Sequence, residues 1–304
     1  MHTNCLIISP QGGLGNRLRA VNSALIIAEK TRRKLLHSWL PIRNAIQGPE
    51  HVSLLQRCEF DDFFAPNSTI VAARPDMTID EVYSEWGPGD GWFIQQSTGQ
   101  RFFNVFAQSR SKNSANAILN SNSQSILLET TLRTWPEDAA GISLQVPSGQ
   151  NRREIYAAYQ KIRPRQEYLE IIHELPEVDI GISIRRGNLL HYCQQARQEA
   201  KGIANWIQAL AKRSEKLIIF SDDPKFRQYL YDETKVASGC SKIDKLLLRT
   251  PPHQAAFLNF LYLALKCKFI FGTPGSSFAQ EAALYGDKPY DLVLSKQDFD
   301  SKTD

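Results

Sequence analysis

The chain has 304 residues, of which 42% are hydrophobic and 22% are charged, a composition typical of a soluble protein with one or two domains. A net charge of +4 fits a small anionic ligand but is too weak to predict a nucleic-acid-binding surface. The five cysteines form no C-x-x-C pair, so we expect neither a zinc site nor a disulfide framework. There is no signal peptide or long apolar segment, so we expect a cytoplasmic protein without a membrane span.

The first predicted elements are a buried strand at residues 5–8 and a helix with an apolar face at Leu18, Val21, Leu25 and Ala28. Between them lies a glycine-rich loop, whose backbone N–H groups can approach an anion or a sugar closely. The loop lacks the third glycine of a dinucleotide fingerprint and the Gly-Lys-Ser/Thr of a P-loop. A tight turn would explain its glycines, but it would not explain the polar pair Asn16-Arg17 at the start of the helix.

Residues 34–39 are predicted to form the second strand, and residues 126–128 the last strand of this half. The region between them is rich in aromatic residues, among them Phe60, Phe63 and Phe64, which we interpret as core in preference to a sugar platform. Turn-forming residues over 135–150 mark a domain boundary. We therefore predict an N-terminal domain over residues 1–145 and a C-terminal domain over residues 146–304.

The second half alternates helices and strands, which predicts a parallel sheet with right-handed crossovers. Pro224 suits the first turn of one helix, which Asp222 or Ser221 could cap. The strands are expected at residues 180–184, 217–220 and 268–271. Helices are expected at 154–162, after a break at 163–164 up to 175, at 202–211, from 224 onward, at 253–266 and at 278–285.

Three predicted strands of this half end in polar loops, which should lie together at one edge of the sheet. Ligands bind at this edge in open α/β sheets, and an arginine there offers a planar fork of donors for phosphate or carboxylate. The alternative is that the arginines only cap a strand and pair with surface acids. The three loops contain Arg185-Arg186, Ser221-Asp222-Asp223 and Gly275-Ser276-Ser277.

These motifs together resemble the fucosyltransferase superfamily of nodulation-type α1,6-, α1,2- and protein O-fucosyltransferases. The similar stretches, in order, are residues 12–18 (GGLGNRL), 184–188 (IRRGN), 220–223 (FSDD), and 257–261 (FLNFL) with 272–278 (GTPGSSF). The resemblance implies an α/β fold of GT-B type, with two Rossmann-like domains whose parallel sheets face each other across a cleft. It implies an enzyme that transfers fucose from GDP-fucose to a glycan or other hydroxyl acceptor. The N-terminal Rossmann-like domain (1–145) would lie on the acceptor side, and the C-terminal one (146–304) would bind the nucleotide sugar.

The resemblance also implies inverting transfer without a metal or cofactor. A metal-dependent site would need an Asp-x-Asp at a strand end, and the chain has this triplet only in its tail, at residues 298–300. By motif position, Arg185 would be catalytic and would grip the diphosphate, and Arg186 would support it or orient the acceptor. The implied donor-binding residues are Gly13, Gly15, Asn16, Arg17, Ser183, Arg185, Arg186, Asn188, Ser221, Asp222, Asp223, Asn259, Thr273, Gly275, Ser276, Ser277 and Phe278.

Two positions depart from the family pattern: Ser183 replaces a histidine, and Asn259 replaces an aspartate that contacts guanine. A carboxylate accepts two hydrogen bonds from guanine, whereas an asparagine accepts only through its oxygen. The donor could therefore be another nucleotide sugar, or the chain could be an inactive nucleotide- or glycan-binding relative. A dehydrogenase is disfavoured by the incomplete glycine motif. The general base is open between Asp90, Glu29, Asp222 and the departing phosphate.

Overall fold

The computed structural model places two compact units, each with its own parallel sheet. The first unit comprises Met1–Ser143 and Pro147–Leu169, and the second comprises Leu144–Val146 and Glu170–Asp304. No helix in the part of the chain described here is long and apolar enough to cross a membrane. The structure describes residues 5–10, 13–37, 39, 58–67, 69–72, 125–130, 149–185, 200–213, 216–236, 250, 252–274 and 276–293.

The sheet of the first unit has the strand order β3-β2-β1-β4 among its described strands, all parallel. The strands are β1 (Cys5–Pro10), β2 (Lys34–His37), β3 (Ile70–Ala72) and β4 (Ser125–Thr130). Helix α1 (Leu14–Lys30) connects β1 to β2 and buries the predicted face on the sheet. Because β2 and β4 lie on opposite sides of β1, the strand order reverses at β1.

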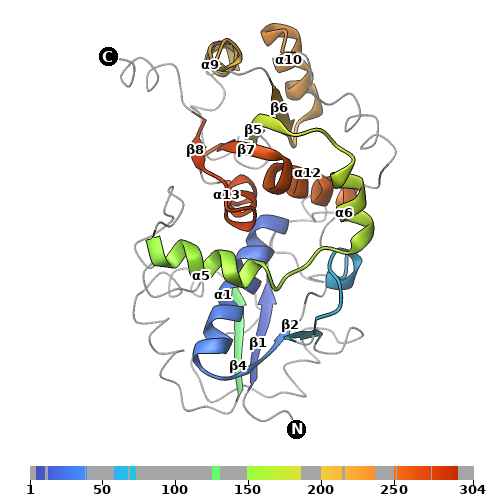
Figure 1. Cartoon of the computed structure of the whole chain (residues 1–304), viewed down its shortest axis with the longest axis vertical. Helices are drawn as coiled ribbons and strands as arrows, with labels where there is room; N and C mark the ends of the chain where they lie inside the picture. Colours follow the sequence, from blue (N-terminus) through green and yellow to red (C-terminus); the bar gives the residue numbers. More distant parts are fainter. Residues whose placement is uncertain are drawn as a thin grey trace, which may run out of the picture. The chain divides into compact units, whose positions relative to one another are not determined.

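Helix α5 (Gly149–Tyr159) packs on α1 and thereby belongs to the first unit (Figure 1). Asn22 of α1 donates a hydrogen bond of 2.9 Å to the Ile155 carbonyl, and Lys30 pairs with Glu154 at 3.0 Å. The division after Leu169 therefore differs from the boundary after residue 145 that the sequence suggested. The reason is that α5 packs against α1 of the first unit.

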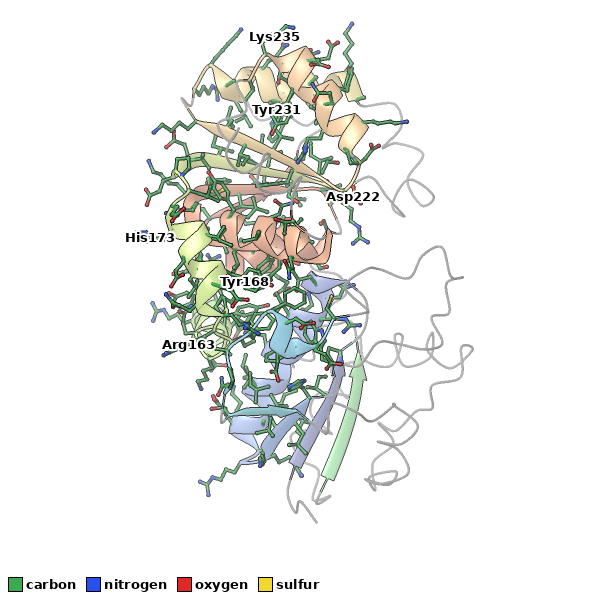
Figure 2. All side chains as sticks on the ribbon, turned by 90° about the vertical axis from the view of Figure 1, so that its right-hand side faces the viewer. Arg163, Tyr168, His173, Asp222, Tyr231 and Lys235 are labelled. Atoms are coloured by element: carbon green, nitrogen blue, oxygen red, sulfur yellow. The ribbon has the colours of Figure 1, made fainter. Side chains whose placement is uncertain are left out.

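A short aromatic segment completes the first unit. The 3-10 helix η3 (Phe60–Asp62) is followed by Phe63 and Phe64, and the three phenylalanine side chains are at most 3% exposed. This confirms their interpretation as core; the other aromatic residues of that region lie outside the described residues. The segment pairs with the chain before α6 (Gln166–His173), where Phe64 forms an antiparallel bridge with Pro164. Within α6, the Tyr168 hydroxyl donates to the Asp62 carbonyl at 3.1 Å (Figure 2).

The sheet of the second unit has the strand order β6-β5-β7-β8 among its described strands, again all parallel. Figure 1 shows helices on both of its faces: α9 and α10 on one, α12 and α13 on the other. The strands are β5 (Val178–Ile184), β6 (Leu217–Ser221), β7 (Cys267–Gly272) and β8 (Tyr290–Leu292). The helices are α9 (Ala200–Ala211), α10 (Pro224–Thr234), α12 (Pro252–Lys266) and α13 (Ser277–Tyr285).

The alternation in β5 decides which helices its two faces contact. Ile182 and Ile184 are buried in a core with side chains of α9 and α10. Gly181 lies on the other face, where an added Cβ would come within 2.6 Å of the Leu263 side chain of α12. A second close approach occurs at Gly286, where a Cβ would lie 1.8 Å from the Ala264 carbonyl oxygen, so α12 and the end of α13 touch backbone to backbone.

Candidate functional site

The carboxyl ends of three strands meet at one edge of the C-terminal sheet. Ile184 of β5 is in register with Ser221 of β6, and Ser183 is in register with Gly272 of β7. The residues that follow these strands therefore lie at the same edge, as the sequence predicted. The strand order reverses here, because β6 and β7 lie on opposite sides of β5.

Arg185 and Thr273 join the loops on either side of this reversal. The backbone N–H of Arg185 donates a hydrogen bond of 3.0 Å to the Thr273 hydroxyl oxygen. The Thr273 N–H in turn donates to the Ser183 carbonyl oxygen at 3.2 Å. Ser183 is only 6% exposed, whereas Arg185 is half-buried. The loop after β7 thus fixes the backbone from which the Arg185 guanidinium extends.

The loop after β6 is organised around the start of α10. Asp223 is the N-cap, and its Oδ1 accepts hydrogen bonds of 3.0 Å from the N–H groups of Lys225 and Phe226. The expectation that Asp222 or Ser221 caps this helix is wrong, because the cap must directly precede the first helical residue, Pro224. The Ser221 hydroxyl accepts from the Asp223 N–H at 3.1 Å, and Asp222 is exposed (Figure 2).

The N-terminus of α13 opens toward the same edge. Ser276 is the N-cap and is 3% exposed, but its hydroxyl makes no cap hydrogen bond and has no partner in the described part of the chain. Ser277, the first residue of the helix, is also buried. The aromatic ring of Phe278 meets Phe260 of α12 edge-on, with 5.7 Å between centroids. The unpaired hydroxyl and the free N–H groups of the first turn are suited to an anion.

Asn259 lies in the middle of α12. Its Oδ1 atom is buried and accepts no hydrogen bond from any residue that the structure describes. A buried acceptor of this kind costs stability unless a ligand or water supplies a donor. The sequence prediction that Asn259 contacts the nucleobase requires such a donor.

The predicted residues of the glycine loop belong to the other unit. Gly13 is the N-cap of α1, Gly15 and Arg17 are buried in its first turn, and Asn16 is half-buried. Glu29, one of the candidate general bases, lies near the opposite end of α1 and pairs with Lys161. This places it away from the loop. Arg186, Asn188, Gly275 and Asp90 lie outside the described residues.

Three buried residues of the same unit as Arg17 were not singled out from the sequence as site residues. Trp39 is 2% exposed, and its ring lies under the Arg17 guanidinium, with 5.0 Å from the guanidinium carbon to the ring centroid. His37, at the end of β2, and Cys58 are also buried. A histidine and a tryptophan two residues apart at the end of a predicted strand were the signal that could have indicated this cluster.

No protein-family model matches the chain, and a search of curated proteins found no significant match. The fold, however, matches solved structures. The fucosyltransferase NodZ from Bradyrhizobium aligns with a TM-score of 0.60 at 15% identity, over 93% of this chain and 92% of that one. A structure of POFUT1 in complex with GDP-fucose aligns with a TM-score of 0.56 at 10% identity, over 95% of this chain and 98% of that one.

These alignments confirm the predicted fold class, an α/β fold of the type found in fucosyltransferases. They include a structure of NodZ α1,6-fucosyltransferase soaked with GDP-fucose, with a TM-score of 0.59 at 15% identity. At this level of identity, the likeness establishes the fold, and the activity has to be argued from the residues of this chain.

Proposed function

We propose that this chain is a glycosyltransferase that transfers fucose from GDP-fucose to a hydroxyl group of a glycan or another acceptor. The observation that carries the proposal is the hydrogen bond between Arg185 and Thr273, at the point where the strand order of the C-terminal sheet reverses. Nucleotides bind at this point in open α/β sheets. The proposal assigns the donor to the C-terminal unit and the acceptor to the N-terminal unit.

The diphosphate is proposed to bind between Arg185 and the start of α13. The Arg185 guanidinium offers two parallel donors to phosphate oxygens from a backbone that Thr273 holds. The buried Ser276 hydroxyl and the first-turn N–H groups of α13 add uncharged donors beside it. What supports the proposal is that these groups lie at one edge of the sheet.

The proposed reaction is an inverting displacement without a metal ion. The acceptor oxygen forms a bond to the anomeric carbon while the bond from that carbon to the phosphate oxygen breaks, and the electron pair leaves with GDP. Arg185 would stabilise the negative charge that grows on the leaving phosphate, because a donor fixed in advance does not have to reorganise. The acceptor proton would pass to a general base or to the departing phosphate.

A second candidate is a transferase that uses a different nucleotide sugar. It is favoured by Asn259, whose buried Oδ1 offers a single acceptor where a carboxylate would offer two oxygens. Ser183 adds to this, since a short buried side chain stands where the family has a histidine. Both candidates require a nucleoside diphosphate at the same edge of the C-terminal sheet.

A binding screen followed by a transfer assay tests the proposal. GDP, GDP-fucose, UDP and ADP are added with either Mg²⁺ or EDTA, and the rise in melting temperature reports binding to the native state. We expect GDP and GDP-fucose to protect the protein equally in both buffers. Protection that EDTA removes would contradict the metal-free reaction, and a preference for UDP would support the second candidate.

The transfer assay uses GDP-fucose with a panel of glycan acceptors, and the anomeric configuration of the product is determined by NMR. We expect the configuration to be inverted relative to the donor. Retention of configuration would contradict the inverting reaction. Tight binding of GDP-fucose without any transfer or hydrolysis would instead identify an inactive nucleotide-binding relative.

A further inference from the structure

Helix α13 begins without a side-chain cap. The hydroxyl of its N-cap residue, Ser276, makes no hydrogen bond to the first turn, whereas the Asp223 side chain accepts from two N–H groups at the start of α10. Such a cap bond satisfies first-turn N–H groups and fixes the start of a helix. Without it, these N–H groups of α13 stay available to a ligand, but packing has to hold the first turn in place.

Packing contacts on two sides hold the first turn of α13. On one side, the Phe278 ring meets the Phe260 ring of α12 edge-on, with 5.7 Å between centroids. On the other side, Ala279 approaches the end of β7, where a Cβ added to Gly272 would lie 2.7 Å from the Ala279 Cβ. The same added atom would lie 2.7 Å from the Tyr290 hydroxyl oxygen. Ala279 and Tyr290 therefore fill the space that a side chain at Gly272 would occupy.

Tyr290 reaches Gly272 along the sheet, from the neighbouring strand β8. It is in register with Ile270, two residues before Gly272 on β7, so its ring leans toward the carboxyl edge of the sheet. The backbone on both sides of Tyr290 is held by β7. The Ile270 N–H donates to the Pro289 carbonyl oxygen at 3.0 Å, and the Val293 N–H donates to the Gly272 carbonyl oxygen at 2.9 Å. The ring therefore extends to this edge from a fixed backbone.

The Tyr290 hydroxyl lies on the same face of the sheet as Ser183. Ile182 and Ile184 are buried in the core that contains side chains of α9 and α10. Ser183, between them, therefore belongs to the opposite face, which α12 and α13 cover (Figure 1). Ser183 is also in register with Gly272. The Tyr290 hydroxyl and the first turn of α13 thus stand at the edge of the sheet to which the diphosphate is assigned.

We propose that Tyr290 is a positioning residue for the diphosphate. Its side chain supports the first turn of α13 and thereby sets where Ser276 and the first-turn N–H groups meet the phosphate. Gly272 is part of the same arrangement, since a side chain there would push Tyr290 and Ala279 apart. The inference rests on the transferase function proposed above, which assigns the diphosphate to this helix start. Tyr290 acts through α13, and the contacts to the ligand remain with α13 and Arg185.

A comparison of GDP with guanosine separates the phosphate contacts from the base contact. Dissociation constants are measured on the full chain, by calorimetry for GDP and by ligand-observed NMR for guanosine. Tyr290→Leu withdraws the ring from the first turn of α13 and should weaken GDP binding about fivefold to tenfold, because oriented donors are lost. Guanosine should bind as to the wild type. Tyr290→Phe keeps the ring but loses the hydroxyl, so its GDP affinity should lie between those of Tyr290→Leu and the wild type.

Tyr231→Phe is the matched control, because the Tyr231 hydroxyl lies on the opposite face of the same sheet and donates to the Ile219 carbonyl oxygen at 3.0 Å. It should lower stability and leave both dissociation constants unchanged. The inference is overturned if both Tyr290 variants bind GDP as the wild type does, or if GDP and guanosine weaken by the same factor. If Tyr290→Leu does not fold, unchanged GDP affinity in Tyr290→Phe overturns it alone. Failure of the transferase proposal would already be seen in the wild type, as a lack of nucleoside diphosphate binding.

Discussion

The backbone N–H of Arg185 donates to the hydroxyl of Thr273, 88 residues later in the chain, at 3.0 Å. This bond joins the loops that follow β5 and β7, the two strands between which the sheet order reverses. The chain therefore positions its proposed diphosphate-binding arginine through the backbone, and the guanidinium stays available for a ligand.

Replacing Arg185 should damage turnover more than folding. Arg185→Ala removes the donor that would stabilise charge on the leaving phosphate and should lower kcat by about 10²–10³. Arg185→Lys keeps the charge but loses the two-pronged geometry, so it should also be severely impaired. Arg213→Ala, at an exposed arginine after α9, is the control. Near-wild-type kcat in Arg185→Lys would show that Arg185 is not a bidentate clamp.

Thr273→Val tests whether the backbone link matters separately from the guanidinium. The valine keeps the shape of the side chain but cannot accept from the Arg185 N–H, so we expect a loss of about 1 kcal/mol in unfolding free energy. Donor affinity should fall as well, because Arg185 is then less well oriented. Thr273→Ser should restore both values. A stable Thr273→Val protein with unchanged donor affinity would show that the link does not orient Arg185.

Asn259→Asp should shift nucleotide preference toward guanine. A carboxylate accepts from both the N1–H and the 2-amino group, so GDP binding should strengthen on the order of tenfold relative to UDP and ADP. Dissociation constants for the three nucleotides measure the shift. Asn205→Asp, on an exposed position of α9, should leave the ranking unchanged. An unchanged ranking in Asn259→Asp would place the residue away from the base.

His37 should make the N-terminal unit less stable in acid. Burial lowers its pKa from 6.5 to about 4, so the folded state holds the ring neutral. The ring is neutral in both states above about pH 6.5, so His37 does not lower the free energy of unfolding there. As the pH falls from 6.5 toward 4, only the unfolded state takes up the proton, and the free energy of unfolding drops by about 2 kcal/mol at pH 5. Urea unfolding of wild type and His37→Phe at pH 7.5 and 5 checks this. The variant should lose less stability, and equal losses in both proteins would contradict the buried neutral histidine.

The main strands could be predicted because each is an apolar run bounded by glycine, proline or charge. The strand expected at residues 180–184 became Val178–Ile184, and the one at 217–220 became Leu217–Ser221. The strands β3 and β8 were not predicted, because three residues are too short to show a period. They depend on neighbouring strands that supply their hydrogen bonds.

The candidate site was predictable to the level of the sheet edge but not of individual contacts. The order of polar loops after strands indicated that the loops after β5 and β7 would lie at one edge of the sheet, but not that the Arg185 N–H would donate to the Thr273 hydroxyl. The role of Asp223 as a helix cap was missed, because the sequence placed Pro224 in the first turn without fixing it as the first helical residue. The cluster of Arg17 with His37 and Trp39 depends on tertiary packing, which periodicity does not report.

Gly286 fixes how α12 and α13 meet, since its backbone rests against the carbonyl of Ala264 with no side chain between them. Asn259 is carried by α12 and Ser276 stands at the start of α13. Under the proposal that Asn259 contacts the base and Ser276 the phosphate, backbone packing at Gly286 would set the spacing between the two contacts. Replacing a single side chain on α12 would then change the base that is accepted without changing this spacing.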